Sequence, residues 1–262
     1  MKATACAPDA GAALPVILVV FTAAWPFAAS GYRPFNSTDA AVAARGEVEI
    51  ELGPLGYVVQ GPDKALVAPS LVLNWGFAQG WEAVLEGRHV VRLGSVSGER
   101  RLRVEDTALS LKGVLREGSL QEKAGPSVAT ELSALLPGIH GDPGIGAEWA
   151  FIVSQRWRDL TVHLNGAAAW TRAHDPGVLG GVILEGHDAW LVRPVAEVFL
   201  ERERDEPAIV SGLLGAIWRV SDGLSFDAAV RLARAGGVNT TELRLGLTWG
   251  FSLGIRSHRD AG

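Results

Sequence analysis

The stretch TELRLGLTWGFSLG, residues 241–254, decides the fold. Every second residue from Leu243 to Phe251 is apolar, and the residues between them are polar or small. Successive side chains of a β-strand point to opposite faces, so this alternation predicts a strand with one apolar and one polar face. In a soluble barrel or sandwich the apolar face would point inward to a core. In a membrane barrel it would meet lipid, and the charges would line a watery interior.

The same alternation recurs along the rest of the chain. Eleven segments show it clearly, and residues 182–185 form a weaker candidate twelfth. Because bacterial membrane barrels contain an even number of strands, we predict an all-β fold, a single antiparallel transmembrane β-barrel of ten or twelve strands. The expected strands are residues 46–52, 66–75, 81–93, 107–116, 127–135, 148–154, 160–165, 195–201, 209–220, 226–232 and 241–254.

The predicted connections differ in length and composition. Short ones are expected at residues 76–80, 156–159 and 220–224, and long polar ones at residues 94–106, 137–146 and 171–188. Short turns at one rim and long loops at the other are typical of outer-membrane barrels. Aromatic residues cluster beside the short turns, where a membrane boundary favours a girdle of rings with one apolar and one wet edge. They are Trp75, Phe77, Trp81, Trp157, Trp218 and Phe226.

The N-terminal region predicts secretion. Residues 11–25 form an apolar run that is too short for a comfortable transmembrane helix, and small residues follow it up to Ser30. We interpret residues 1–30 as a signal peptide cleaved near Ala29 or Ser30, which leaves residues 31–262 as the barrel. A membrane anchor or a buried first helix is the alternative. The only cysteine, Cys6, lies in this region, so the mature chain would have no disulfide and no thiolate site.

Composition excludes several classes of function. The net charge of -5 gives no basic footprint for nucleic acid. The chain has no Gly-Lys-Ser/Thr phosphate loop, and residues 144–146 lack the third glycine of a dinucleotide loop. We therefore predict no cofactor. Three His/Asp pairs lie in expected loops, but their spacing is not diagnostic of a metal site, and we predict none. The pairs are His140 with Asp142, His174 with Asp175, and His187 with Asp188.

Charged and polar residues in the predicted strands share the face opposite the apolar one. His163 and Asn165 could suggest an outer-membrane phospholipase, which needs His, Ser and Asn. Such a site acts on lipid and should face outward, whereas these two residues share a face with Thr161, so we predict no enzyme. The predicted lumen-lining residues are Glu82, Glu86, Arg88, Arg92, Lys112, Arg116, His163, Asn165, Glu197, Glu201, Arg231 and Arg244. In a narrow barrel these charges would pair and plug the interior, and in a wider one they would line a channel.

Several segments together resemble a bacterial outer-membrane family named for the MetA pathway of phenol degradation and also described as transporters. The resembling segments are residues 33–40, 46–51, 74–82, 135–138, 160–165, 194–201 and 218–231. The resemblance implies an outer-membrane β-barrel with a transport or channel role and carries no catalytic residues. One departure is the C-terminus, where Phe251 is followed by a polar tail instead of ending the chain as a terminal aromatic.

These observations together predict a channel or transporter for small solutes in the bacterial outer membrane. The family name implies hydrophobic or aromatic solutes. The expected partners are outer-membrane lipid, the barrel-assembly machinery and a small-molecule solute. Two alternatives remain open: a closed structural or binding barrel that acts through its extracellular loops, and a soluble periplasmic β-barrel binder.

Overall fold

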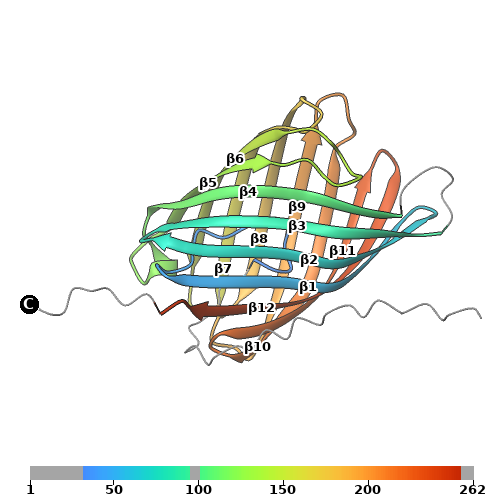
Figure 1. Ribbon diagram of the computed structural model, residues 1–262. Helices are drawn as coiled ribbons and strands as arrows, with labels where there is room; N and C mark the ends of the chain where they lie inside the picture. The colour runs from blue at the N-terminus through green and yellow to red at the C-terminus, as the bar shows by residue number, and fades with distance from the viewer. Residues whose placement is uncertain (1–31, 95–100, 255–262) are drawn as a thin grey trace, which may run out of the picture.

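The computed structural model describes residues 32–94 and 101–254. The predicted signal peptide, Cys6 and the division between residues 30 and 31 lie outside the described residues. Twelve strands form a closed barrel in which each strand pairs antiparallel with the next and β12 pairs with β1 (Figure 1). The predicted all-β antiparallel barrel is therefore confirmed, with the larger of the two expected strand numbers.

The strands of the barrel are nine to sixteen residues long. A tilted strand needs about 9–11 residues to cross a membrane, so each of them is long enough. One short 3₁₀ helix, η1 (Ser119–Gln121), interrupts the connection between β4 and β5. The strands are β1 (Glu47–Gln60), β2 (Asp63–Ala78), β3 (Trp81–Leu93), β4 (Leu102–Arg116), β5 (Ser127–Leu135), β6 (Gly146–Arg156), β7 (Leu160–Trp170), β8 (Pro176–Gly186), β9 (Val192–Glu203), β10 (Ile209–Ser221), β11 (Leu224–Ala235) and β12 (Val238–Ser252).

The weak candidate at residues 182–185 is part of a full spanning strand. β8 occupies Pro176–Gly186, so the long loop expected over residues 171–188 is wrong. Glycines at 177, 180 and 181 interrupt the apolar alternation in its first half, which explains why the sequence pattern is faint there. The loop expected at residues 94–106 is also shorter than predicted, because β4 already begins at Leu102.

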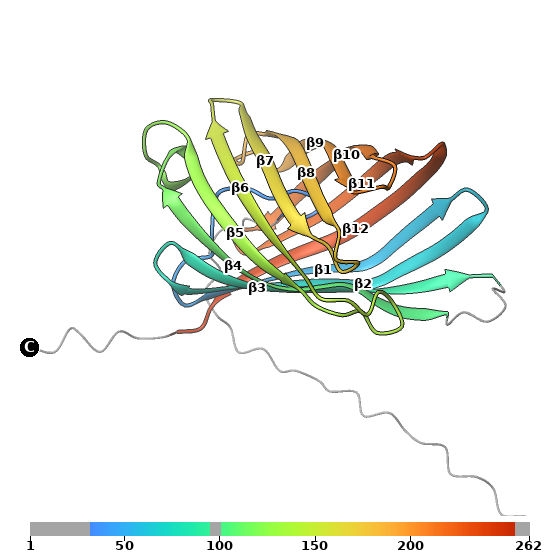
Figure 2. The ribbon, with the colours of Figure 1, turned by 90° about the horizontal axis from the view of Figure 1, so that it is seen from above.

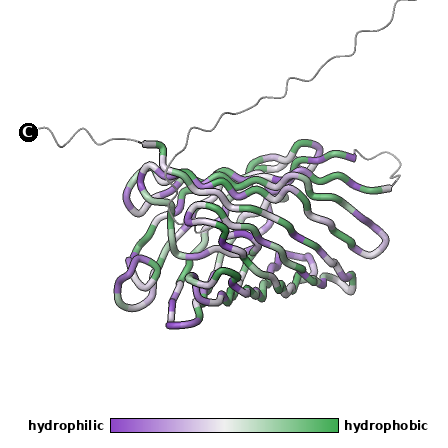
Figure 3. The backbone as a smooth tube through the Cα atoms, turned by 90° about the horizontal axis from the view of Figure 1, so that it is seen from below, coloured by the Kyte–Doolittle hydropathy of each residue, from purple (hydrophilic) through white to green (hydrophobic). Residues whose placement is uncertain are grey.

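The apolar face of the strands points outward. In β12 the side chains of Leu243 and Leu245 are exposed, whereas Glu242 and Thr248, which point to the other face, are buried. Every strand contributes at least one large apolar side chain to the exposed exterior, and Figure 3 shows hydrophobic and hydrophilic positions alternating along the tube. A soluble domain rarely exposes apolar surface on this scale, whereas a membrane barrel presents it to lipid. No helix of the described residues is long and apolar enough to cross a membrane.

The two rims of the barrel are distinct. We call the edge where β1 begins and β12 ends the terminal rim, since Glu47 pairs there with Ser252, and the opposite edge the loop rim. The predicted short connections all lie at the terminal rim, together with the aromatic residues expected beside them. The predicted contrast in length is only partial: residues 61–62 and 236–237 are tight turns at the loop rim, and residues 117–126 form a longer connection at the terminal rim.

The barrel interior is polar. Lys112, Glu51 and Glu82 belong to the largest fully buried side chains, all on the inward face, while the buried apolar clusters are small. Residues 32–44, which precede β1, run inside the ring of strands and fill part of this space (Figure 2). We call this stretch the lumen segment. The interior of the barrel is therefore formed by the lumen segment as well as by the twelve strands.

Candidate functional site

The lumen segment contacts inward-facing side chains from strands around the whole barrel. The Glu197 carboxylate on β9 accepts hydrogen bonds from the backbone N–H groups of Asn36, at 2.9 Å, and Ser37, at 2.7 Å. It also accepts one from the side-chain amide of Asn36, at 3.1 Å. Glu197 therefore satisfies three donors of the segment and is buried by it, as a carboxylate inside a protein requires.

Asn165 on β7 binds the next residue of the segment through both atoms of its amide. Its Oδ1 accepts from the Thr38 backbone N–H at 3.2 Å, and its Nδ2 donates to the Thr38 carbonyl at 2.8 Å. Further along, Ser154 Oγ on β6 accepts from the Ala40 N–H at 2.9 Å. Polar side chains thus replace a neighbouring strand as hydrogen-bond partners for this stretch of main chain.

The first residues of the segment are held from β1, β2, β11 and β12. The Arg33 guanidinium pairs with Asp227 at 3.2 Å and donates to Ser70 Oγ at 3.0 Å. Arg244 donates to the carbonyl of Pro34 at 2.7 Å and to the side chain of Asn36 at 2.8 Å. These two arginines connect opposite ends of the chain, since Arg33 and Asp227 lie 194 residues apart in sequence.

Lys112 on β4 is the centre of a second charged cluster. Its Nζ lies 3.5 Å from Glu82 Oε1 and 3.6 Å from Asp39, and it donates to Thr38 Oγ1 at 3.2 Å. The ammonium also lies 3.8 Å from the centroid of the Tyr32 ring, a cation–π contact. A fully buried lysine is tolerable only with such compensation, and three of these four partners, Tyr32, Thr38 and Asp39, belong to the lumen segment.

Four inward-facing glycines make room for the segment. A Cβ added at Gly246 would lie 2.1 Å from Arg33 Nε, and one at Gly181 would lie 1.9 Å from Ser37 Oγ. Gly53 and Gly76 are crowded in the same way by Arg33 and by the carbonyl of Ala44. Any side chain at these positions would collide with the segment, so the wall is shaped to receive it.

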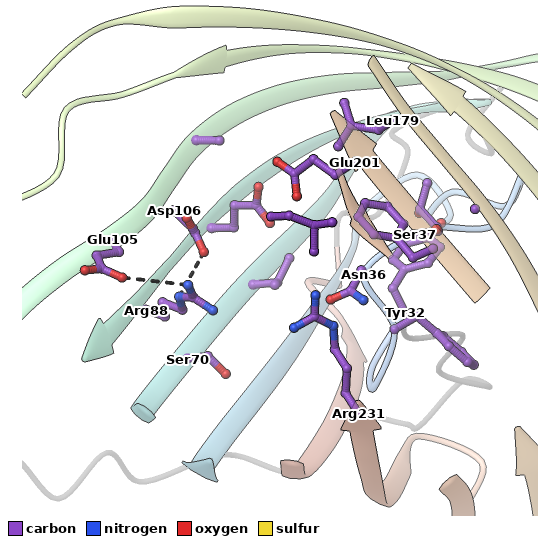
Figure 4. Close-up of a pocket in the computed structure, with 18 of the residues that line it drawn as sticks. Tyr32, Asn36, Ser37, Ser70, Arg88, Glu105, Asp106, Leu179, Glu201 and Arg231 are labelled. Carbon is purple, nitrogen blue, oxygen red and sulfur yellow. Dashed lines mark ion pairs between the residues drawn. The ribbon is translucent and has the colours of Figure 1, made fainter. Parts of the chain in front are cut away.

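The part of the lumen toward the loop rim is open. It holds a cavity of about 920 Å³, bounded on one side by the lumen segment and on the others by polar wall residues (Figure 4). Arg88 pairs there with Glu105 and Asp106, at 3.7 and 2.8 Å. Across the cavity, Glu242 pairs with both Arg231, at 3.5 Å, and Arg244, at 2.9 Å. Among the acidic side chains that line the cavity, Glu86, Glu131, Glu148 and Glu201 make no ion pair with the described residues.

The predicted lumen residues have three different environments. Most of them line the cavity: Glu82, Glu86, Arg88, Arg92, Lys112, Asn165, Glu201, Arg231 and Arg244. Glu197 and His163 are buried on the inward face beneath or beside the lumen segment. Arg116 instead lies exposed at the terminal rim, where it donates to the carbonyls of Ala124 and Pro126. A bulge in the β4–β5 pairing between Val114 and Arg116 ends the regular alternation just before it.

The hydrolase arrangement considered for His163 and Asn165 is not accessible. His163 Nδ1 lies 2.7 Å from Ser154 Oγ, and its Nε2 lies 3.7 Å from Glu185, which superficially resembles a catalytic triad. Ser154 is fully buried, however, and the Ala40 backbone covers its hydroxyl. Among the described residues, no group of three or more His, Cys, Asp or Glu side chains is arranged to hold a metal ion.

Sequence reasoning missed the lumen segment and several of its partners. Ser154 and Asp227 share the inward parity of their strands, so alternation could have identified them as lumen residues. Residues 33–40 belong to the segments that carry the family resemblance, but residues 32–44 show neither the period of a strand nor that of a helix, so the sequence does not place them in the lumen. Their position in the lumen depends on partners on β1, β7, β9, β11 and β12, and no local pattern encodes it.

Comparisons with known structures identify the fold. The barrel is similar to the COG4313 outer membrane channel from Pseudomonas putida F1, with a TM-score of 0.56 and 13% identity over 80% of this chain and 96% of that one. It is also similar to the NanC porin, with a TM-score of 0.57 and 9% identity over 77% of this chain and 98% of that one. The KdgM porin in complex with disordered oligogalacturonate is similar as well, with a TM-score of 0.53 and 12% identity over 77% of this chain and 98% of that one.

These TM-scores show that the chain shares the barrel fold of these outer-membrane porins and channels, and at such low identity they show the fold alone. No family model matches the chain, and no curated protein matches it either. The coarse resemblance to outer-membrane channel barrels is thus supported, whereas membership of the MetA family stays a prediction.

Proposed function

We propose that this chain is a bacterial outer-membrane channel for small solutes. The observation that carries the proposal is the polar cavity of about 920 Å³ inside a barrel whose exterior is apolar. A wet interior gives a solute a path that lipid does not, and the charges on the wall set which solutes enter it. The shared fold with outer-membrane porins and channels supports this reading.

Location and partners follow from the same surface. The exposed apolar side chains on every strand would contact outer-membrane lipid, and the aromatic residues near the terminal rim would mark one boundary of the bilayer. Insertion would require the barrel-assembly machinery after removal of residues 1–30 as a signal peptide. Both termini of the barrel lie at the terminal rim, which we assign to the periplasmic side because it carries most of the short connections.

The solute class is narrowed by the wall of the cavity. The MetA resemblance implies hydrophobic or aromatic compounds, yet the wall is lined largely by charged and polar residues. Small aromatic solutes that carry hydroxyl or other polar groups satisfy both conditions, because such groups replace water at the charged wall. The cavity is lined by more acidic than basic side chains, and this excess favours cations over anions.

A closed binding barrel is the second candidate function. The observation that favours it is the lumen segment, which fills the terminal half of the interior with hydrogen bonds to the wall. In that case the protein would act through the loop rim and would pass no solute. The two functions share the fold and differ only in whether the lumen segment leaves a continuous path.

Solute uptake by proteoliposomes separates the two functions. The purified chain is reconstituted in liposomes, and swelling is followed by light scattering in iso-osmolar arabinose, glucose and a phenolic solute. A channel predicts swelling that is faster than in protein-free liposomes and that slows as solute size increases. A closed barrel predicts the protein-free rate for every solute. Heat-dependent mobility on a gel serves as the control that the reconstituted barrel is folded.

A further inference from the structure

The wall of the lumen recognises the main chain of the segment that lies in it. Glu197 accepts two consecutive backbone N–H groups, and Asn165 pairs with both the N–H and the carbonyl of the residue that follows. Glu82 Oε2 accepts the N–H of Ala43 at 2.7 Å. These contacts do not depend on the identity of the segment's side chains, as in recognition of an extended peptide by a strand edge.

Carbonyl groups of the segment have matching donors. Arg244 donates to the carbonyls of Pro34 and Phe35, at 2.7 and 3.3 Å, and Gln121 donates to that of Ala40 at 3.1 Å. The inward glycines leave a channel for the backbone between these donors and acceptors. The wall thus carries both halves of a peptide-binding groove, acceptors for N–H groups and donors for carbonyl groups.

The contacts that hold the segment are of a kind that water can replace. Several are hydrogen bonds or ion pairs to side chains that border the polar cavity, among them Asn165, Arg244 and Lys112. When water can take the place of the segment at such a group, the exchange of one hydrogen bond for another costs little net free energy. The segment also contributes to two small apolar clusters, through Phe35 against Val195, Leu213, Ile217 and Ala229, and through Ala40 against Ala129 and Ile152. The cavity reaches the segment directly, so a solute in the lumen meets residues 32–38.

We propose that the terminal half of the lumen is a groove for an extended peptide backbone, which residues 32–44 occupy in cis and leave reversibly. The ligand class of the vacated groove is a short extended peptide with free N–H groups facing Glu197 and Asn165. The proposal deepens the proposed channel function, because departure of the segment would widen the path. Departure of the segment can be measured by thiol labelling, which does not require the barrel to conduct.

Thiol labelling tests whether the segment leaves. Ala40 is fully buried beneath the wall, so a cysteine there reacts with a membrane-impermeant maleimide only when the segment moves out. In a Cys6→Ser background, Ala40→Cys is expected to label slowly and completely in the folded, unboiled protein. The matched cavity-lining variant Ala169→Cys is expected to label quickly and reports that the reagent enters the lumen.

A disulfide that holds the lumen segment against the wall provides a control for this test, and we call it the lock. The Cβ of Ser37 lies 3.1 Å from the position of a Cβ at Gly181, slightly closer than the roughly 3.5–4.5 Å of a disulfide. Ser37→Cys also removes the hydroxyl that a side chain at Gly181 would meet, so Ser37→Cys and Gly181→Cys can form a bond after the segment shifts by a few tenths of an ångström. Oxidation of these cysteines is expected to abolish labelling of Ala40→Cys, and reduction is expected to restore it. The proposal is overturned if Ala40→Cys stays unreactive in the folded protein but reacts after denaturation, or if the lock leaves its rate unchanged.

A synthetic peptide tests the ligand class. The peptide YRPFNSTDAAVAA, the sequence of residues 32–44, should capture the vacated groove and raise the labelling rate of Ala40→Cys several-fold. A control peptide with proline in place of Ser37 lacks the N–H that Glu197 accepts and should have no effect. Equal effects of the two peptides, or none from either, would refute the groove. If labelling behaves as proposed while liposomes pass no solute, the groove stands and the channel function fails.

Discussion

At the scale of single residues, neighbours along a strand face opposite surroundings. On β3, Leu85 is 47% exposed on the outer surface, whereas Glu86 lines the cavity. The sequence predicts this division because side chains alternate across a strand. The sequence could not predict which inward charges would form ion pairs, because their partners come from other strands or from the lumen segment.

Substitutions at these two neighbours should have opposite effects. Glu86→Gln removes an acidic side chain that makes no ion pair, so the barrel should assemble normally. At an alkaline pH at which Glu86 is ionised, the variant should lose part of the preference for cations. Two unit charges about 4 Å apart interact by about 1 kcal/mol in water, which suffices to shift a permeability ratio measurably. Leu85→Arg places a charge in lipid and should destabilise the barrel by roughly 2–4 kcal/mol. Urea unfolding in lipid and the reversal potential are the measurements.

The assignment of faces fails if both variants fold equally well or if their order is reversed. In that case Leu85 would not meet lipid, and the interior charges would not line a path for ions. Glu148→Gln serves as a second inward variant on β6, because Glu148 lines the same cavity without an ion pair.

Inward glycines give a second residue-scale prediction. Gly246→Val would place atoms where the Arg33 guanidinium now lies and would break its 3.2 Å pair with Asp227. We expect the barrel to assemble and the lumen segment to loosen, seen as faster maleimide labelling of Ala40→Cys. Gly212→Val on the outward face of β10, where only one atom lies within 4 Å, is the matched control and should leave that rate unchanged. Identical rates in the two variants would show that Gly246 does not shape the groove.

At the scale of elements, alternation predicted the strands well wherever the apolar face was regular. It placed eleven segments within observed strands, and it found only a fragment of β8, whose glycines carry no side chain to show the pattern. The lumen segment was missed for a different reason. Residues 32–44 form no regular element, and their conformation is fixed by side chains up to 210 residues away in sequence. A local reading contains no information on such contacts.

The role of β8 as a spanning strand can be tested directly. Val182 pairs with Leu164 on β7 and Val198 on β9, so its backbone belongs to the continuous ladder. Val182→Pro removes one N–H from that ladder, and an unpaired group in lipid costs several kcal/mol. The folded band on an unboiled gel should largely disappear. Ala173→Pro, in the exposed connection before β8, should keep the folded band. If both variants lose the folded band, or if both keep it, the result contradicts β8 as a spanning strand.

At the scale of the whole molecule, the barrel has an apolar exterior, a polar cavity open toward the loop rim and a filled terminal half. The exterior follows from strand periodicity alone, which is why the fold class was predictable. The lumen segment occupies the terminal half because inward glycines leave room for it and polar side chains bind it. These residues face one another only after β12 closes onto β1. Whether the lumen conducts therefore depends on the balance between these wall contacts and water.

Single-channel recording is the most direct test of the central claim. The full chain, purified in its folded, heat-modifiable form, is added to a planar lipid bilayer in symmetric salt. A channel predicts discrete conductance steps, with a reversal potential in a salt gradient that shows preference for cations and weakens in Glu86→Gln. A bilayer that stays silent after verified insertion of the folded protein would contradict the channel and leave the closed barrel as its function.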